Sequence, residues 1–155
     1  MLTPDAVSLF SRSVLCWLST VGDDGWPSVS PKEIFVASSP TQILIADIAS
    51  PRSVRNITAN PRVCVAAVDV FEQHGYQAYG RARIVAADPN DRPDLVVPLR
   101  RLVGDAFPIR AVICVEVDRV TRILAPSVWM YPDVPRGQRR EGALKAYGVR
   151  DRDAE

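Results

Sequence analysis

The sequence predicts a mainly β protein: a small antiparallel β-barrel of six strands with a few helices. Six apolar-rich runs of strand length follow one another, and clusters of Gly, Pro, Asp, Asn and Ser separate them. Two helical patterns interrupt this succession, one early and one late. With 155 residues, of which 47% are hydrophobic, the chain is long enough for one domain with its own core.

The N-terminal part begins with a short helix and continues as a β-meander. Thr3 suits the N-cap position and Pro4 the first helical position, so we expect a helix that reaches about Ser11. Gly-Asp-Asp-Gly at 22–25 is typical of a hairpin turn, and Ser-Ser-Pro-Thr makes a second turn. The three antiparallel strands joined by these turns are predicted at residues 14–21, 26–37 and 42–48.

The middle of the chain contains one helix and two strands. The helix is predicted from Ser50 or Pro51 to about Ala59, because Asn60 and Pro61 stop it. Residues 62–70 are almost wholly apolar, which indicates a strand buried on both faces. In the strand predicted at 76–86, Gly80 indicates a bulge or a close backbone approach.

The C-terminal part changes character after the last long strand. Residues 88–104 have a helical pattern that Pro98 should kink or split, and residues 109–124 form the last strand. The barrel body is therefore assigned to 1–124. Residues 125–155 carry many charges and form a tail that packs on the barrel or on a dimer partner, with a helix around 141–147.

Charge and cysteine content limit the classes of function. Nineteen Lys and Arg against eighteen Asp and Glu leave a net charge of +1, which argues against nucleic-acid or membrane partners. No apolar run approaches the roughly 18 residues of a membrane span, and no signal-peptide pattern is present. Cys16, Cys64 and Cys114 lie in apolar runs without metal-site spacing, which predicts reduced core cysteines, no metal and a cytoplasmic location. The single histidine, His74, is expected on a surface loop.

The start of the central helix offers two interpretations. With Ser50 at the N-cap and Pro51 after it, the backbone N–H groups of Arg52 and Ser53 lack intrahelical partners and favour an anion. The Arg52 guanidinium and the Ser53 hydroxyl would hold phosphate oxygens, and Asn56 lies one turn further on the same face. The alternative is an ordinary helix that Ser50 caps itself. Spacing alone leaves both open.

Residues 56–63 read Asn-Ile-Thr-Ala-Asn-Pro-Arg-Val, and Arg52 lies upstream of them. In this stretch and in the order of its elements, the sequence resembles the flavin-binding split-barrel family, and the stretch is the most specific part of the resemblance. This family includes pyridoxamine 5′-phosphate oxidase and small bacterial FMN-binding proteins, and the resemblance covers about residues 14–124. It implies a six-stranded split barrel that works as a homodimer, with FMN sites at the interface.

The resemblance also implies which residues contact FMN. Arg52 and Ser53 would hold the phosphate, and the segment before the helix would follow the isoalloxazine ring; that segment is Ala46, Asp47, Ile48, Ala49 and Ser50. The neighbouring strand would add Ser30, Pro31 and Lys32. Asp47 is expected to contribute only its backbone, because a carboxylate beside an anionic cofactor is unfavourable.

Two of these residues have a second interpretation. Lys32 is either a cation near the flavin or a solvated lysine on an edge strand. Trp129, in the exposed-looking Trp-Met-Tyr run of the tail, either packs on its own barrel or covers the partner's flavin.

The leading function is therefore an FMN-dependent oxidoreductase that acts on a small molecule, with no catalytic residue assigned. The Arg-x-His element of pyridoxamine 5′-phosphate oxidase itself is absent, so that substrate is not expected. The alternatives are a non-enzymatic FMN protein for electron transfer or flavin storage, or a split barrel that binds F420 or haem.

Overall fold

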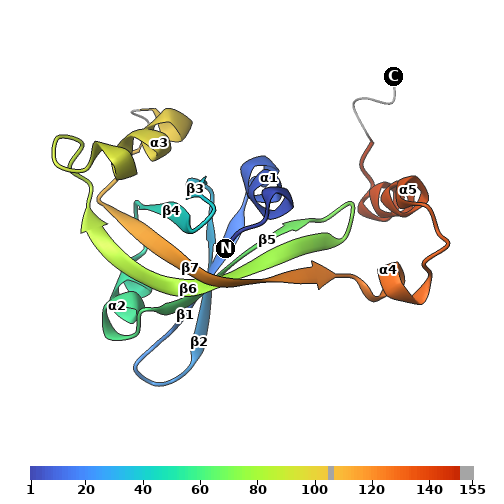
Figure 1. The fold of residues 1–155 in the computed structure, drawn as a ribbon, viewed down its shortest axis with the longest axis horizontal. Coiled ribbons are helices and arrows are strands. Elements are labelled where there is room, and N and C mark those ends of the chain that lie inside the picture. Colours follow the sequence, from blue (N-terminus) through green and yellow to red (C-terminus); the bar gives the residue numbers. More distant parts are fainter. Residues whose placement is uncertain (105–106, 151–155) are drawn as a thin grey trace.

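The computed structural model describes residues 1–104 and 107–150 (Figure 1). Within these residues the chain forms five helices, α1 (Pro4–Arg12), α2 (Pro51–Ala59), α3 (Pro93–Val103), α4 (Pro126–Met130) and α5 (Arg136–Tyr147). The seven strands described are β1 (Cys16–Val21), β2 (Pro27–Lys32), β3 (Phe35–Ser39), β4 (Gln42–Asp47), β5 (Arg62–Asp69), β6 (His74–Ala86) and β7 (Ala111–Leu124). They pair in one sheet in the order β2-β1-β5-β6-β7-β4-β3, with antiparallel neighbours, so the mainly β prediction is confirmed.

The two edge strands of this sheet are consecutive in the chain. β2 ends at Lys32 and β3 begins at Phe35, so only Glu33 and Ile34 connect opposite edges. A connection this short requires the sheet to curl until its edges approach each other. The prediction of one strand over 26–37 is therefore wrong, and the structure has seven strands in its described residues where six were expected.

The two longest strands, β6 and β7, pair along nearly their whole length and cross the molecule (Figure 1). Their register shifts between Tyr79 and Gly80, where a β-carbon on Gly80 would lie 1.9 Å from the carbonyl oxygen of Glu116. Both expectations for Gly80, a bulge and a close backbone approach, are confirmed. Only glycine fits this point of contact between the strands.

Two clusters of buried side chains form the core. The larger cluster lies between α1 and the concave sheet, where Phe10 meets Phe35 edge to face with ring centroids 6.3 Å apart. The smaller cluster packs α3 against β4 and β7 through Leu95, Leu99 and Val112. The prediction that β5 is buried on both faces is wrong, because its buried and less buried residues alternate, as in a strand with one face toward the core.

Three helices differ from the prediction in detail. α3 begins at Pro93 rather than near residue 88 and continues through Pro98, so the predicted split does not occur. α4 was not predicted, and α5 starts at Arg136, five residues before the expected 141. The final residues 151–155 of the predicted tail lie outside the described part of the chain.

The helix α5 packs on the turn between β5 and β6. Tyr147 meets Phe71 edge to face with centroids 6.0 Å apart, Arg136 pairs with Glu72, and Ala143 is buried. Trp129 on α4 is 67% exposed, and Met130 and Tyr131 are each more than half exposed. The tail therefore contacts its own sheet through α5, while the Trp-Met-Tyr run faces outward.

The cysteines behave as apolar core residues. Cys16 and Cys114 are buried and Cys64 is half-buried, and all three are free thiols. Burial raises the pKa of Cys16 to about 12 and also raises the pKa of the other two thiols. Among the described residues no helix is both long and apolar enough to cross a membrane.

Replacing Gly80 by Ala should destabilise the protein by about 3 kcal/mol, because the added methyl group overlaps the Glu116 carbonyl and forces the two longest strands apart. Urea denaturation measures the loss. Gly142→Ala is the matched control: Gly142 lies in α5 with open space around its α-carbon, so the same change there should stabilise by about 0.5–1 kcal/mol. Equal effects at both sites would contradict the close approach.

Candidate functional site

The N-terminus of α2 is organised by hydrogen bonds from outside the helix. Ser50 occupies the N-cap position, but its side chain makes no capping hydrogen bond. Its hydroxyl instead accepts a hydrogen bond from Nζ of Lys32, and its backbone N–H donates to Oδ1 of Asp47 at 2.9 Å. The interpretation that Ser50 caps the helix is therefore wrong. The N–H groups of the first turn receive no acceptor from it.

Lys32 is a buried cation rather than a solvated edge residue. Only 6% of the residue is exposed, so the alternative of a solvated lysine is wrong. Burial lowers its pKa from the usual value, and the nearby charge of Asp47 acts in the opposite direction. Asp47 is also buried, and its carboxylate both accepts from Ser50 and faces the lysine charge. Asp47 thus contributes its side chain to the structure of the site, beyond the backbone contact expected from the sequence.

One cavity beside this group, named here the Lys32 cavity, has a volume of about 270 Å³. Six predicted flavin contacts line it: Pro31, Lys32, Ala46, Ile48, Ala49 and Ser50. The sequence analysis missed its other lining residues, which are Glu33, Ile34 and Phe107. Glu33 and Ile34 lie inside the single strand predicted at 26–37, so there was no reason to select them. Phe107 lies before the last strand, and no local pattern distinguishes it.

A second cavity of about 290 Å³, the Arg52 cavity, lies between α2 and the hairpin that joins β1 and β2. From α2 it is lined by Arg52, Arg55 and Asn56. The hairpin contributes Asp23 and Asp24, so residues with two guanidinium groups and two carboxylates line the same cavity. The Asp24 carboxylate also accepts from the Trp26 backbone N–H at 3.0 Å and closes the turn.

Asn56 connects the Arg52 cavity to the core. It is buried, and its Nδ2 donates to Oγ1 of Thr20 on β1 at 2.9 Å. This bond fixes α2 against β1, with Arg52 and Asn56 one turn apart in the helix. The predicted grouping of these two residues on one face is confirmed, since both line the same cavity.

Four predicted residues lie apart from these cavities. Ser30 on β2, Asp47 at the end of β4 and the buried Ser53 on α2 line neither of them. Trp129 lies on α4, at the opposite end of the molecule from α2 (Figure 1). Within one chain, therefore, Trp129 does not reach the start of α2.

Replacing Lys32 by Met should remove one pH-dependent contribution to stability. Because the folded pKa of Lys32 lies below the usual 10.5, the unfolded chain binds more protons between those two values, and the free energy of unfolding rises with pH in that window. The free energy of unfolding of the wild type should therefore rise relative to that of Lys32→Met from pH 8 toward pH 10.5, about the usual lysine value. Urea denaturation at several pH values measures it, and parallel pH profiles would contradict the lowered pKa.

Comparisons with known proteins agree on the fold. A family model described as pyridoxamine 5′-phosphate oxidase matches residues 2–123. The crystal structure of HupZ from Group A Streptococcus is 20% identical with a TM-score of 0.68, and the match covers 81% of this chain and 96% of that one. An FMN-binding protein from Syntrophomonas wolfei is 12% identical with a TM-score of 0.65, covering 77% and 84%. General Stress Protein 26 from Bacillus anthracis is 17% identical with a TM-score of 0.59, covering 76% and 90%.

No curated protein matches the chain. Identities this low support the fold alone, and the fold is the split barrel that the sequence pattern predicts. The family model spans nearly all of the body, from α1 to the end of β7. The chain therefore belongs to the pyridoxamine 5′-phosphate oxidase-like family of split-barrel proteins.

Proposed function

We propose that the protein binds FMN at the N-terminus of α2 and is an oxidoreductase acting on a small molecule. The observation that carries the proposal is the position of the two cavities. The Lys32 cavity contains six of the eight residues expected along the isoalloxazine ring, and the Arg52 cavity contains Arg52, one of the two residues expected at the phosphate. Ser50 lines the first and Arg52 the second, so the cavities flank the first turn of α2.

The chemistry of the donors suits this cofactor. A phosphate at the start of α2 would accept from the uncapped N–H groups and from the guanidinium of Arg52. The carboxylates of Asp23 and Asp24 oppose an anion there, and Arg55 offsets part of their charge. The Syntrophomonas wolfei protein of the same fold is FMN-binding by name, which supports the choice of cofactor.

At the other end, Lys32 would serve the flavin ring. Its buried ammonium group carries three N–H donors, one of which bonds Ser50. A fixed positive charge in this cavity favours a flavin ring that gains negative charge on reduction. FMN, when bound, supplies hydride transfer at its N5 atom, and the apolar walls from Ile34, Ala46 and Ile48 exclude water from the ring.

An electron-transfer or storage role remains the competing proposal. The described residues that line the Lys32 cavity and the Arg52 cavity include no His, Cys or Tyr, the side chains that most often donate protons near neutral pH. Steady-state oxidation of NADPH or NADH by the FMN-loaded protein, with a quinone acceptor, supports the oxidoreductase. Reduction by dithionite without any turnover supports the carrier.

Replacing Arg52 by Ala should weaken FMN binding by about 10- to 100-fold, because one charge-assisted contact to phosphate is worth roughly 1.5–3 kcal/mol. Riboflavin binding should barely change, since riboflavin lacks the phosphate. Flavin fluorescence titration measures both ligands. Arg101→Ala is the matched control, because Arg101 is an exposed arginine on α3 that lines neither cavity. Equal losses for FMN and riboflavin would contradict a phosphate site at Arg52.

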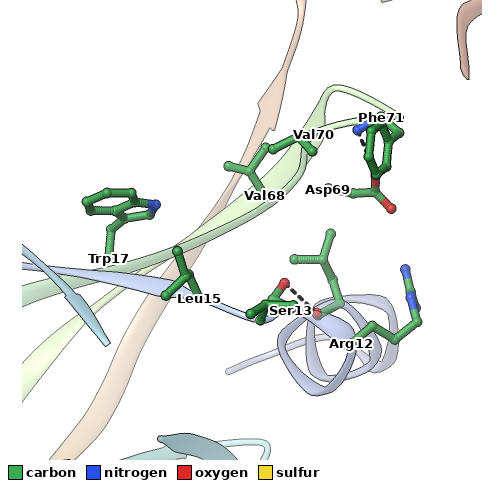
Figure 2. A pocket seen from close by; sticks show the side chains of 10 residues that line it. Arg12, Ser13, Leu15, Trp17, Val68, Asp69, Val70 and Phe71 are labelled. Atoms are coloured by element: carbon green, nitrogen blue, oxygen red, sulfur yellow. Dashed lines mark hydrogen bonds between the residues drawn. The ribbon is translucent and has the colours of Figure 1, made fainter. Parts of the chain in front are cut away.

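We also propose that the protein is a homodimer. Mainly apolar side chains line a cavity of about 380 Å³ between the end of α1, β1 and the end of β5 (Figure 2), and Val14, Trp17 and Val70 there are exposed. The exposed Trp129 and its two neighbours form a second apolar surface on the same chain. Apolar surfaces of this extent favour burial against a second copy.

Light scattering at micromolar concentration should give twice the chain mass of 17.1 kDa. Val70→Glu should shift the protein to monomer, because it would bury a charge in an interface of about 2,000 Å² or more. Leu102→Glu introduces the same charge at an exposed leucine on α3 and should leave the mass unchanged. A wild-type mass of one chain would rule out the dimer.

A further inference from the structure

A third cavity, named here the α5 cavity, lies between α1, the paired ends of β6 and β7, and α5, with a volume of about 420 Å³. Arginines from three elements line it: Arg12 from α1, Arg122 from β7, and Arg136 and Arg139 from α5. His74, the first residue of β6, lines it as well. The prediction that His74 is a loop residue is therefore wrong, since it pairs with Leu124 in the sheet.

Among the described residues, the positive charges that line this cavity outnumber the negative ones. The lining carboxylates in that part of the chain are Asp5 and Glu72, against four guanidinium groups. Glu72 pairs with Arg136 and lies 3.4 Å from Nδ1 of His74, so one carboxylate serves two partners. The other three arginines of the cavity form no ion pair with a carboxylate of the described residues.

Within the described part of the chain, the hydrogen-bond partners of Arg12 and Arg139 are neutral. Arg12 donates to the Ser8 hydroxyl at 2.6 Å, and Arg139 donates to the Tyr131 carbonyl oxygen at 2.6 Å. Nε of Arg139 is buried and is the one buried side-chain nitrogen or oxygen without a hydrogen-bond partner in the described residues. Arg122 forms no ion pair within the described residues. A buried donor without an acceptor costs free energy that an incoming acceptor recovers.

We propose that the α5 cavity binds a small organic anion, which presents a carboxylate or a phosphate group to Arg122 and Arg139. Guanidinium groups bind both kinds of anion through paired N–H donors. The apolar body of the ligand would lie against Tyr76, Leu124 and Val128, which also line the cavity. A volume of about 420 Å³ is in the range of small-molecule sites.

The site extends beyond the part of the chain that the family model describes. That model ends at residue 123, whereas Val128, Arg136 and Arg139 come after it. The α5 cavity also shares no lining residue with the Lys32 and Arg52 cavities. The proposal therefore does not depend on FMN binding.

Amide chemical shifts of the full chain, titrated with phenyl phosphate and with benzoate, test the site. Saturable shifts should appear around residues 74–76 and 122–124, and benzyl alcohol, which has the same ring without a charge, should produce none there. Arg122→Gln and Arg139→Gln should each weaken binding about tenfold or more. Tighter binding of phenyl phosphate assigns the site to phosphate monoesters, and tighter binding of benzoate assigns it to carboxylates.

Arg81→Gln is the matched control, because Arg81 is an exposed arginine on β6 outside the cavity and should leave the affinity unchanged. Arg122 is exposed, so its replacement should not disturb folding, and thermal melting checks this for both variants. The proposal is overturned by three results: shifts confined to α2 and the β1–β2 hairpin, absence of saturation with both anions, or equal weakening by Arg81→Gln. Failure of FMN to bind would leave these outcomes unaffected.

Discussion

The connection between β2 and β3 constrains the rest of the molecule. These strands form opposite edges of the sheet, and Glu33 and Ile34 are the only residues between them. This short connection holds the two edges of the sheet close together. The Ile34 carbonyl accepts a hydrogen bond from the Ala46 N–H at 2.9 Å, which holds the connection against the end of β4. The end of β2 and the residues that lead into α2 are thereby brought to one place. The Lys32 cavity exists because of this closure.

Closure also determines the electrostatics of the site. Lys32 is the last residue of β2, and closure removes its ammonium group from water, which disfavours the charged form. Asp47 offsets part of that cost and at the same time orients the backbone of Ser50. One buried carboxylate thus stabilises the cation and shapes the start of α2. Removal of either partner would leave the other as a buried charge without compensation.

Local patterns predicted the elements well where the signals were strong. The bounds of α2, Pro51–Ala59, follow from Pro51 at its start and from Asn60-Pro61 after its end. The break at Glu33 was not predictable, because closure imposes it and the local sequence does not. Pro98 remains inside α3 because Leu95 and Leu99 are buried against the sheet, a tertiary effect that outweighs the local rule.

The same division applies to the site. The segment from Ala46 to Ser50, predicted to follow a flavin ring, lines one cavity except at Asp47, whose carboxylate accepts a hydrogen bond from the Ser50 backbone instead. The role of the Ser50 hydroxyl depends on Lys32, 18 positions away, so a capping rule based on neighbours assigned it wrongly. Phe107 and the α5 cavity depend on which distant segments meet, and composition carries no information about that.

Burial of the cysteines affects how fast their thiols are oxidised. Thiolate is the form that reacts with peroxide, disulfides and alkylating agents. With a pKa of about 12, Cys16 has about one molecule in ten thousand ionised at pH 8, and the raised pKa of Cys64 and Cys114 acts in the same direction. Sulfur in this core is therefore close to inert while the chain stays folded. Oxidative damage at these positions would follow transient unfolding, so the lifetime of the thiols reports how often the barrel opens.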